Sequence, residues 1–485
     1  MIIIDSDLNV PLYLQIYGQI KEKIILKQFL QGSKLPSTRI LSTTLNVSRN
    51  TVESAYLQLC AEGYIESKAG SGFIVLKLDT SIISKLKSKN SKSSEETKNN
   101  LLEVKSFYKY DFKYGNIGAS DFPLRIWHKI SNKCLTSLTA EDMTSYSASK
   151  GELDLQIEIM EYLNKSRGFS CNPKQVIILP GLEYCLSMLS QLFRKDFNQI
   201  ALEDPGHYGA RNIFVNNGYD VIPIGLEKDG IDLEELENSS AKIVYITPSH
   251  QFPMGSVMPI QKRLKLLDWA MRKNGIIIED DYDSELRYNS RPIPSIKSIA
   301  LKENVVYIGT FSKALSPSLR INYMVLPQVW LERYDEIFAT YQTSVPLIQQ
   351  KTIQQFMHLG YFDTHLRKVC LANKRKHDLL IHTINEVMGD KVIIHGKNAG
   401  LHVLLEFNNG LREEEIIIKA KNYDVAVYPV SIFWMRPENY SNNMVMLGFG
   451  EINESEIVDG IKLLNDATGN AQISIDETSV NRLLT

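Results

Sequence analysis

Lys313 is the residue of this chain whose neighbours best suit covalent chemistry. It stands among small hydroxyl residues in the segment GTFSKALSPSLR, residues 309–320, directly after the apolar run Val305–Ile308. A lysine amine can hold an aldehyde cofactor as a Schiff base, and hydroxyl groups with an arginine can bind the phosphate of such a cofactor. The alternative interpretation of the segment is a solvated surface lysine that follows a strand.

A second segment, IIIEDDYD at residues 276–283, supplies acids. An apolar run that ends in acids is typical of a buried parallel strand, and ligands bind at the carboxyl edge of such sheets. Pyridoxal phosphate needs an acid beside its ring nitrogen, and a tyrosine two residues later could hydrogen-bond its phenolic oxygen. Without Lys313, a solvated acidic turn would be the better interpretation.

Three further segments could complete a cofactor site. Residues 177–184 (IILPGLEY) lead a strand through a glycine into a helix, whose N-terminus can bind phosphate. Residues 201–208 (ALEDPGHY) offer flat rings that could stack on a cofactor, and residues 245–255 (YITPSHQFPMG) form a polar loop after another strand.

In this order the segments resemble the fold-type I aminotransferase family, and EDDYDSE, TPSHQFPMG and GTFSKALSPSLR are closer still to the MocR/GabR subfamily of bacterial regulators. The resemblance covers roughly Tyr110 to Leu464. It implies pyridoxal 5'-phosphate as the cofactor, a homodimer, and Lys313 as the Schiff-base lysine. It also implies that the other cofactor contacts are Asp280 at the pyridinium nitrogen, Tyr282 at the phenolic oxygen, Gly181, Thr310, Ser312 and Arg320 at the phosphate, and His250.

The chain departs from this subfamily at one position. Where a tyrosine usually follows EDPG, this chain has His207, with Tyr208 next. An imidazole can still stack on a cofactor ring, so both residues are candidates for that role.

The first 77 residues predict a different domain. Apolar residues at helical spacing favour a helix over residues 11–30, and LPSTR opens a second helix. Ser48 is a good N-cap for a third helix with the apolar face Val52, Ala55, Tyr56 and Leu59. Residues 64–75 predict a hairpin with a Gly-Ser-Gly tip. Helix, helix-turn-helix and hairpin together make a winged helix.

LPSTR, VSRNTVESAYLQLCAEGYI and AGSGFIV are similar to the GntR-type winged helix. The resemblance implies binding to double-stranded operator DNA through Arg39, Ser48, Arg49, Asn50, Thr51 and Gly72. Eight Lys/Arg against six Asp/Glu in residues 1–77 give this part a net charge of only +2. The charge alone would also fit a small helical cap with no nucleic-acid partner.

Three regions are therefore expected: a winged helix-turn-helix domain at 1–77, a flexible linker at 78–105 and an aminotransferase-like domain at 106–485. The linker has few large apolar residues and cannot offset its ordering entropy. Strand-like runs alternate with helical segments, which predicts a doubly wound α/β sheet and then a smaller α/β domain. The predicted strands are 176–180, 199–203, 242–247, 276–280, 304–309 and 322–326, with 401–407 and 444–449 in the smaller domain.

Bulk properties restrict the partners. The net charge of −2 gives no general attraction to nucleic acid or membranes, so DNA binding must be local. No segment reaches the roughly 18 apolar residues that a membrane-spanning helix needs. Five scattered cysteines fit reduced thiols, and the N-terminus does not look like a secretion signal. We therefore expect a cytoplasmic protein.

Two functions remain open. The leading hypothesis is a transcription regulator that senses an amino compound, such as γ-aminobutyrate, or pyridoxal phosphate itself. The alternative is an active aminotransferase with a DNA-binding appendage. Catalysis would need a clamp for the substrate carboxylate, usually arginine. Arg436 is the candidate clamp and Arg211 is a weaker one.

Overall fold

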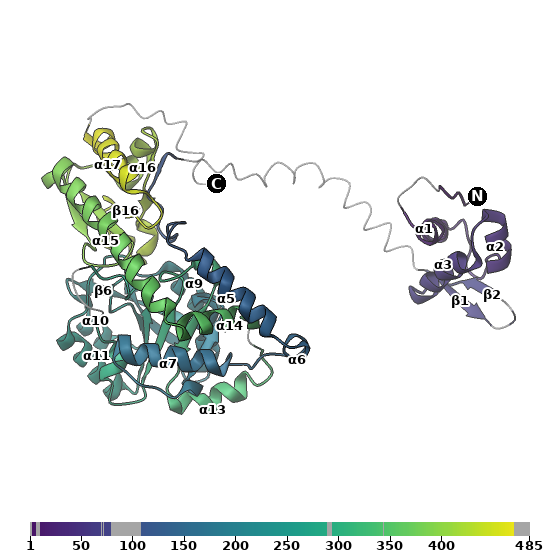
Figure 1. Cartoon of the computed structure of the whole chain (residues 1–485), viewed down its shortest axis with the longest axis horizontal. Coiled ribbons are helices and arrows are strands. Elements are labelled where there is room, and N and C mark those ends of the chain that lie inside the picture. The colour runs from purple at the N-terminus through teal and green to yellow at the C-terminus, as the bar shows by residue number, and fades with distance from the viewer. Residues whose placement is uncertain are drawn as a thin grey trace. The chain divides into compact units, whose positions relative to one another are not determined.

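The computed structural model describes residues 2–5, 10–68, 70, 72–78, 108–288, 293–342 and 344–469. The chain divides into two compact units, Met1–Ser106 and Phe107–Thr485 (Figure 1). The predicted linker at 78–105 lies, apart from Leu78, outside the described residues.

The first unit has the predicted winged-helix order. Helices α1 (Leu12–Ile25), α2 (Thr38–Leu45) and α3 (Arg49–Ala61) precede the antiparallel strands β1 (Ile65–Lys68) and β2 (Gly72–Val75). Helix α1 ends five residues before the predicted Leu30, because Lys27 adopts a left-handed conformation with φ 58°. A lysine in that conformation cannot continue a right-handed helix.

The core of the first unit confirms the predicted apolar faces. Ile16, Ile20 and Ile24 of α1 are buried, and so is the α3 face of Val52, Ala55, Tyr56 and Leu59. The Tyr56 hydroxyl donates to the carbonyl of Pro36 at 2.9 Å. This bond satisfies the one polar group that the α3 face brings into the core.

The second unit is built on an eight-stranded sheet of order β4-β11-β10-β9-β8-β5-β6-β7. All six predicted large-domain strands are present. Strand β11 is antiparallel to both of its neighbours, and β7 is antiparallel to β6. The strands are β4 (Val176–Leu179), β5 (Gln199–Asp204), β6 (Asp220–Glu227), β7 (Gly230–Ile231), β8 (Ile243–Ile246), β9 (Ile276–Asp281), β10 (Val305–Thr310) and β11 (Asn322–Val325).

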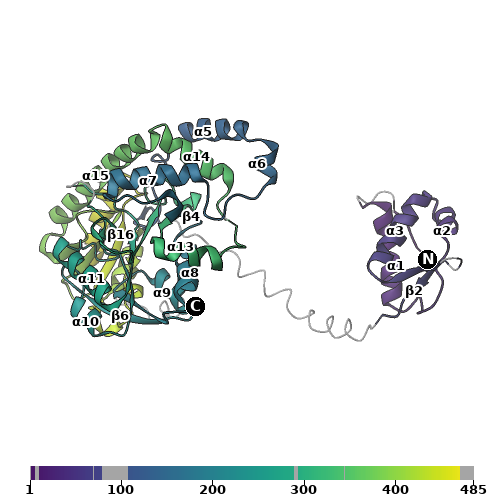
Figure 2. The ribbon, with the colours of Figure 1, turned by 90° about the horizontal axis from the view of Figure 1, so that it is seen from below.

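Helices cover both faces of this sheet. Figure 2 shows β4 between α7 on one side and α8 and α13 on the other. Alternation of side chains produces these two cores, since Ile177 faces α8 whereas Ile178 faces α7. One face carries α8 (Leu182–Phe193), α9 (Tyr208–Asn216) and α13 (Gln328–Ile337). The other carries α5 (Leu124–Ser137), α7 (Leu153–Arg167), α10 (Leu233–Asn238), α11 (Ile260–Lys273), α12 (Ile296–Ile299) and α14 (Leu347–His358), and the short α6 (Ala140–Thr144) follows α5.

A smaller α/β part follows the long helix α15 (Tyr361–Val387), as predicted (Figure 1). Its four-stranded sheet has the order β12-β13-β16-β15, and β3 near the start of this unit pairs with β14. The elements are β3 (Tyr110–Asp111), β12 (Val392–His395), β13 (His402–Phe407), α16 (Glu413–Lys421), β14 (Val425–Ala426), β15 (Tyr428–Pro429), β16 (Met444–Gly448) and α17 (Glu454–Gly469). Within the described ranges, no helix is long and apolar enough to cross a bilayer.

Candidate cofactor site and nucleic-acid interface

Lys313 follows β10 at the carboxyl edge of the sheet and is half-buried. Its amine donates to the carbonyl of Gly115 at 3.1 Å and lies 4.2 Å from the centre of the Tyr114 ring. Burial lowers the pKa of Lys313 to about 8. A much larger fraction of this amine is therefore neutral and nucleophilic at neutral pH than for an exposed lysine.

Asp280 is buried on β9, the strand next to β10 in the sheet. The hydroxyl of Tyr245, on β8, donates to its carboxylate. Burial raises the pKa of Asp280 to about 7, and a positive charge placed beside it would favour its ionised form. This is the chemistry expected of an acid that keeps a pyridine nitrogen protonated.

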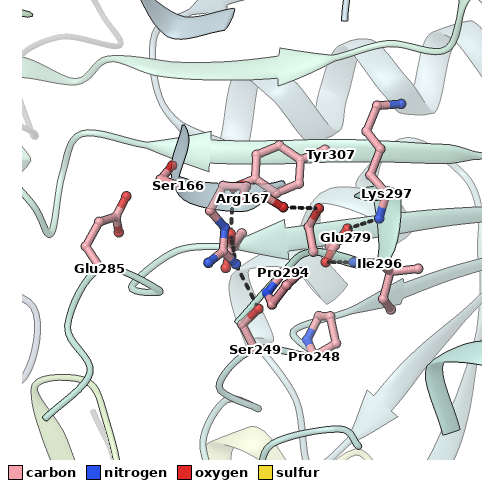
Figure 3. A network of polar contacts seen from close by, with 12 residues as sticks. Ser166, Arg167, Pro248, Ser249, Glu279, Glu285, Pro294, Ile296, Lys297 and Tyr307 are labelled. Carbon is pink, nitrogen blue, oxygen red and sulfur yellow. Dashed lines mark hydrogen bonds and ion pairs between the residues drawn. The ribbon is translucent and has the colours of Figure 1, made fainter. Parts of the chain in front are cut away.

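Side chains alternate along a strand, so the acids on either side of Asp280 lie on the opposite face of β9. Figure 3 shows one of them, Glu279, at Ile296 and Lys297. Asp281 forms an ion pair with Arg167 at 2.5 Å, and both side chains are 1% exposed. Asp281 also accepts from the Tyr307 hydroxyl. Glu279 accepts from the backbone N–H groups of Ile296 and Lys297 at 2.7 and 3.0 Å. The network anchors the strand that presents Asp280.

Tyr282 lies two residues beyond Asp280 and contacts His250. The Tyr282 oxygen is 3.0 Å from Nδ1 of His250, and the same nitrogen is 2.7 Å from a carboxylate oxygen of Asp283. Nε2 of His250 is buried without a hydrogen-bond partner among the described residues. Burial raises the pKa of Tyr282 above its usual range, so its hydroxyl stays protonated and can donate to a phenolate oxygen.

Gly181 and Arg320 meet at the start of α8. Gly181 has φ +94°, and a β-carbon at this position would collide with the Arg320 guanidinium. No side chain caps the first turn of α8, so its N–H groups remain available to an anion. Arg320 forms an ion pair with the exposed Glu183 of the same turn. A bound phosphate would have to compete with that carboxylate.

Thr310 and Ser312 lie beside this turn at the end of β10. The Thr310 hydroxyl donates to Oδ1 of Asn322 at 3.1 Å and accepts from the Ser312 N–H at 3.0 Å. Together these residues offer what a phosphorylated pyridine aldehyde needs: an amine for its aldehyde, an acid for its ring nitrogen, and the α8 turn with Arg320 for its phosphate. Pyridoxal 5'-phosphate therefore fits the residues that are present.

His207 and Tyr208 differ in their surroundings. His207 is half-buried, caps α9 by accepting from the Ala210 N–H at 3.0 Å, and has its pKa lowered to about 4 by burial. The nearby charge of Lys313 acts in the same direction, whereas that of Glu183 opposes it. Tyr208 is 45% exposed and its ring centre is 6.1 Å from that of His207. His207 is thus the less exposed of the two rings.

The two arginines considered as carboxylate clamps are engaged by the protein itself. Nε of Arg436 donates to Asp204 at 3.1 Å, and its Nη1 donates to Glu235 at 2.7 Å. Arg211 donates to the backbone carbonyls of Trp434 and Ile432 at 3.4 and 3.5 Å. Arg436 therefore joins the loop before β16 to the end of β5.

Sequence reasoning missed four residues of this region. Tyr114 covers the lysine amine, Tyr245 supports Asp280, and Phe252 and His402 pack beside Tyr114, with ring centres 5.6 and 4.7 Å away. Tyr245 and Phe252 do lie in the segment 245–255 singled out above, and Tyr245 is the penultimate residue of β8 as Asp280 is of β9. Tyr114 and His402 come from segments without such a signal.

The predicted DNA-binding residues gather at the start of α3, with Arg39 on α2 and Gly72 on β2. Ser48 accepts from the Thr51 N–H at 3.1 Å, which fixes the first turn of α3. Arg49 and Asn50 on that turn are exposed, as are Arg39 and Gly72. Gly72 has φ +83° beside the hairpin tip. An exposed first turn with arginine and amide side chains suits contacts with phosphates and base edges.

Comparison with known proteins agrees with both units. Residues 12–75 match the gntR family of bacterial regulatory proteins, and residues 116–438 match aminotransferase class I and II. The chain is 37% identical over 466 residues to the uncharacterized HTH-type transcriptional regulator YdeL of Bacillus subtilis, covering 96% of this chain and 98% of that one. It is 29% identical over 480 residues to the probable rhizopine catabolism regulatory protein MocR of Rhizobium meliloti, covering 96% of each.

A solved structure supports the fold of the second unit. The kynurenine aminotransferase of Pyrococcus horikoshii matches with a TM-score of 0.68 and 25% identity, over 79% of this chain and 96% of that one. The chain therefore belongs to the MocR-type regulators of the gntR family, in which a winged helix-turn-helix domain precedes an aminotransferase class I and II domain.

Proposed function

We propose that this chain is a cytoplasmic transcription regulator that carries pyridoxal 5'-phosphate on Lys313 and changes its operator binding when an amino compound, or the cofactor itself, binds. The observation that carries the proposal is the half-buried Lys313 amine at the same sheet edge as the buried Asp280. This arrangement occurs in a chain that also has a GntR winged helix.

Each residue has a distinct task in this proposal. When bound, pyridoxal phosphate supplies an aldehyde that reacts with amines and a ring that withdraws electrons. Lys313 holds the cofactor, Asp280 holds a proton at the ring nitrogen, and Tyr282 donates to the phenolic oxygen. The α8 turn with Arg320 binds the phosphate, and His207 lies over the ring.

Operator binding is assigned to the start of α3. We propose that Arg49 and Asn50 reach base edges in the major groove, while Arg39 and the Gly72 turn contact phosphates. A homodimer would present two winged helices to paired half-sites. A ligand alters this binding only if it has different affinities for two conformations of the protein.

An active aminotransferase is the second candidate. The observation in its favour is the lowered pKa of Lys313, because a lysine with a pKa of about 8 can accept and return protons near neutral pH. The regulator is preferred because transamination of amino acids needs a clamp for the substrate carboxylate, and the two candidate arginines, Arg436 and Arg211, are already bonded within the protein.

One pair of measurements separates the two candidates. Fluorescence anisotropy of the labelled operator, with and without amines, should show a ligand-dependent change in affinity. Steady-state assays across amino donors and keto acids should show turnover far below the ordinary range of about 1–1000 per second. Rapid turnover with no ligand effect on the operator would establish the aminotransferase instead.

A further inference from the structure

The Tyr114 ring, whose centre lies 4.2 Å from the Lys313 amine, belongs to a group of aromatic side chains in mutual contact. We call Tyr114, His207, Phe252, His402 and Phe433 the aromatic wall. The Phe252 ring centre lies 5.6 Å from that of Tyr114, 5.6 Å from that of His207 and 4.9 Å from that of Phe433. Behind the wall the packing is apolar, with Leu404, Val430 and Met446 all buried in the same cluster.

The wall offers no positive charge to a ligand carboxylate among the described residues. Its two histidines have their pKa lowered to about 4 by burial, so both are neutral at physiological pH. Nε2 of His402 is already hydrogen-bonded to the carbonyl of Pro253 at 3.0 Å. The two candidate clamps outside the wall already have partners in the protein. Arg436 donates to Asp204 and Glu235, and Arg211 donates to backbone carbonyls.

Negative charge is present instead. Asp283 is buried, and its negative charge raises the pKa of Lys313, against the larger lowering effect of burial. Its carboxylate also lies 2.7 Å from Nδ1 of His250. A second carboxylate brought here would lose its hydration without gaining a cation, and it would be repelled by Asp283.

We infer that the amino compound sensed by this chain is an amine without a carboxylate, with an aromatic or apolar body that lies against the aromatic wall. This inference rests on the proposed function, since it names the class of ligand that reaches Lys313. Its amine would react at the cofactor, and its body would gain from ring contacts and from burial of apolar surface. Amino acids, whose carboxylate must be matched by a cation, would be excluded.

The test uses full-length protein saturated with pyridoxal phosphate and a matched pair of probes. 2-Phenylethylamine and L-phenylalanine differ by one carboxylate. Titrations are followed by the visible absorbance of the cofactor and by operator anisotropy. We expect 2-phenylethylamine to bind at least about tenfold more tightly, since a buried unmatched charge is strongly disfavoured. γ-Aminobutyrate and putrescine extend the panel to an aliphatic carboxylate and a diamine.

Two variants locate the ligand body. Phe252→Leu removes the ring that contacts all four other members of the wall, and it should weaken binding of 2-phenylethylamine by about 3- to 10-fold, given the usual strength of aromatic pairs. Met446→Arg places a cation in the same cluster and should shift preference toward L-phenylalanine, with Met446→Leu as its volume-matched control. If the arginine variant fails to fold, Phe252→Leu still decides the point.

The outcomes distinguish this inference from the function on which it rests. Tighter binding of L-phenylalanine or γ-aminobutyrate than of 2-phenylethylamine overturns the inference, and so does a preference for putrescine. Equal affinity of 2-phenylethylamine for Phe252→Leu and the parent protein overturns it as well. A protein that takes up no pyridoxal phosphate, or does not bind an operator, overturns the proposed function instead.

Discussion

Gly181 lies so close to Arg320 that any side chain at position 181 would collide with the guanidinium. The glycine also has φ +94°, a conformation that L-residues rarely adopt. Gly181→Ala should therefore weaken pyridoxal phosphate binding at least about tenfold by displacing Arg320, a loss of about 1.4 kcal/mol. Absorbance titration measures this. Gly360→Ala is the matched control, because Gly360 has φ +73° with no atom within 4 Å of an added β-carbon.

Glu183 competes with any phosphate at the start of α8. Its carboxylate pairs with Arg320, and both side chains are more than half exposed. Glu183→Gln should tighten pyridoxal phosphate binding by about 1.5- to 5-fold, because exposed ion pairs contribute about 0.2–1 kcal/mol. The affinity is measured by equilibrium titration, with Glu234→Gln in the first turn of α10 as the control. Weaker binding in Glu183→Gln would mean that the carboxylate positions Arg320 for the phosphate.

The pKa of Lys313 predicts a pH profile. Burial lowers this pKa from 10.5 to about 8, so the neutral amine becomes the major form above pH 8. The rate at which pyridoxal phosphate attaches should rise from pH 6.5 and level off above about pH 8.5. Stopped-flow absorbance checks the profile, with Nα-acetyllysine as the reference that continues to rise toward pH 10. A plateau shared by both amines would contradict the assignment.

Arg49 should contribute to operator affinity and to base preference. Its side chain is exposed on a turn that the Ser48 cap holds in place. Arg49→Ala should cost about 1–3 kcal/mol in operator binding, the usual value of one arginine contact to a base. Gel-shift titration at fixed salt measures this, and Arg272→Ala on α11 provides an exposed control. Unchanged operator affinity of Arg49→Ala would contradict the assignment of the first turn of α3 to the DNA interface.

His402 predicts a loss of stability in mild acid. Burial lowers its pKa to about 4, so the unfolded chain binds one more proton than the folded chain between about pH 4 and 6.5. The contribution of His402 to the free energy of unfolding is therefore fully present above pH 6.5, and it declines as the pH falls toward 4. His402→Gln keeps a donor for the Pro253 carbonyl and should reduce the difference in urea midpoint between pH 7 and pH 5. An unchanged difference would mean that His402 is not the group responsible.

The sequence signals that succeeded are short and local. The six predicted strands of the eight-stranded sheet are largely apolar runs buried on both faces, and the acids of IIIEDD stand at the end of one of them. The winged helix was equally accessible, because Ser37 and Ser48 are N-caps and the α3 face repeats at helical spacing. Strand β6 was missed because Pro223 and Gly225 interrupt its pattern and only Ile224 is fully buried.

The rest depended on pairings between distant segments. The partners of Arg436 lie more than 200 residues earlier, at Asp204 and Glu235, and no local pattern announces them. Tyr114 reaches Lys313 because β3 pairs with β14 and places the start of this unit beside the smaller sheet. Such contacts are fixed by the folded topology, which propensity and periodicity do not encode.

The described parts of the two units keep separate hydrophobic cores. The cluster around Tyr56 draws only on residues 2–78, and the other clusters draw on residues 110–464. A recombination event that joins genes between these two segments therefore leaves intact the buried packing described within each unit. Selection can then change the operator specificity of the first unit and the ligand specificity of the second independently. Exchanging one gene segment is enough to connect an existing ligand to a new operator.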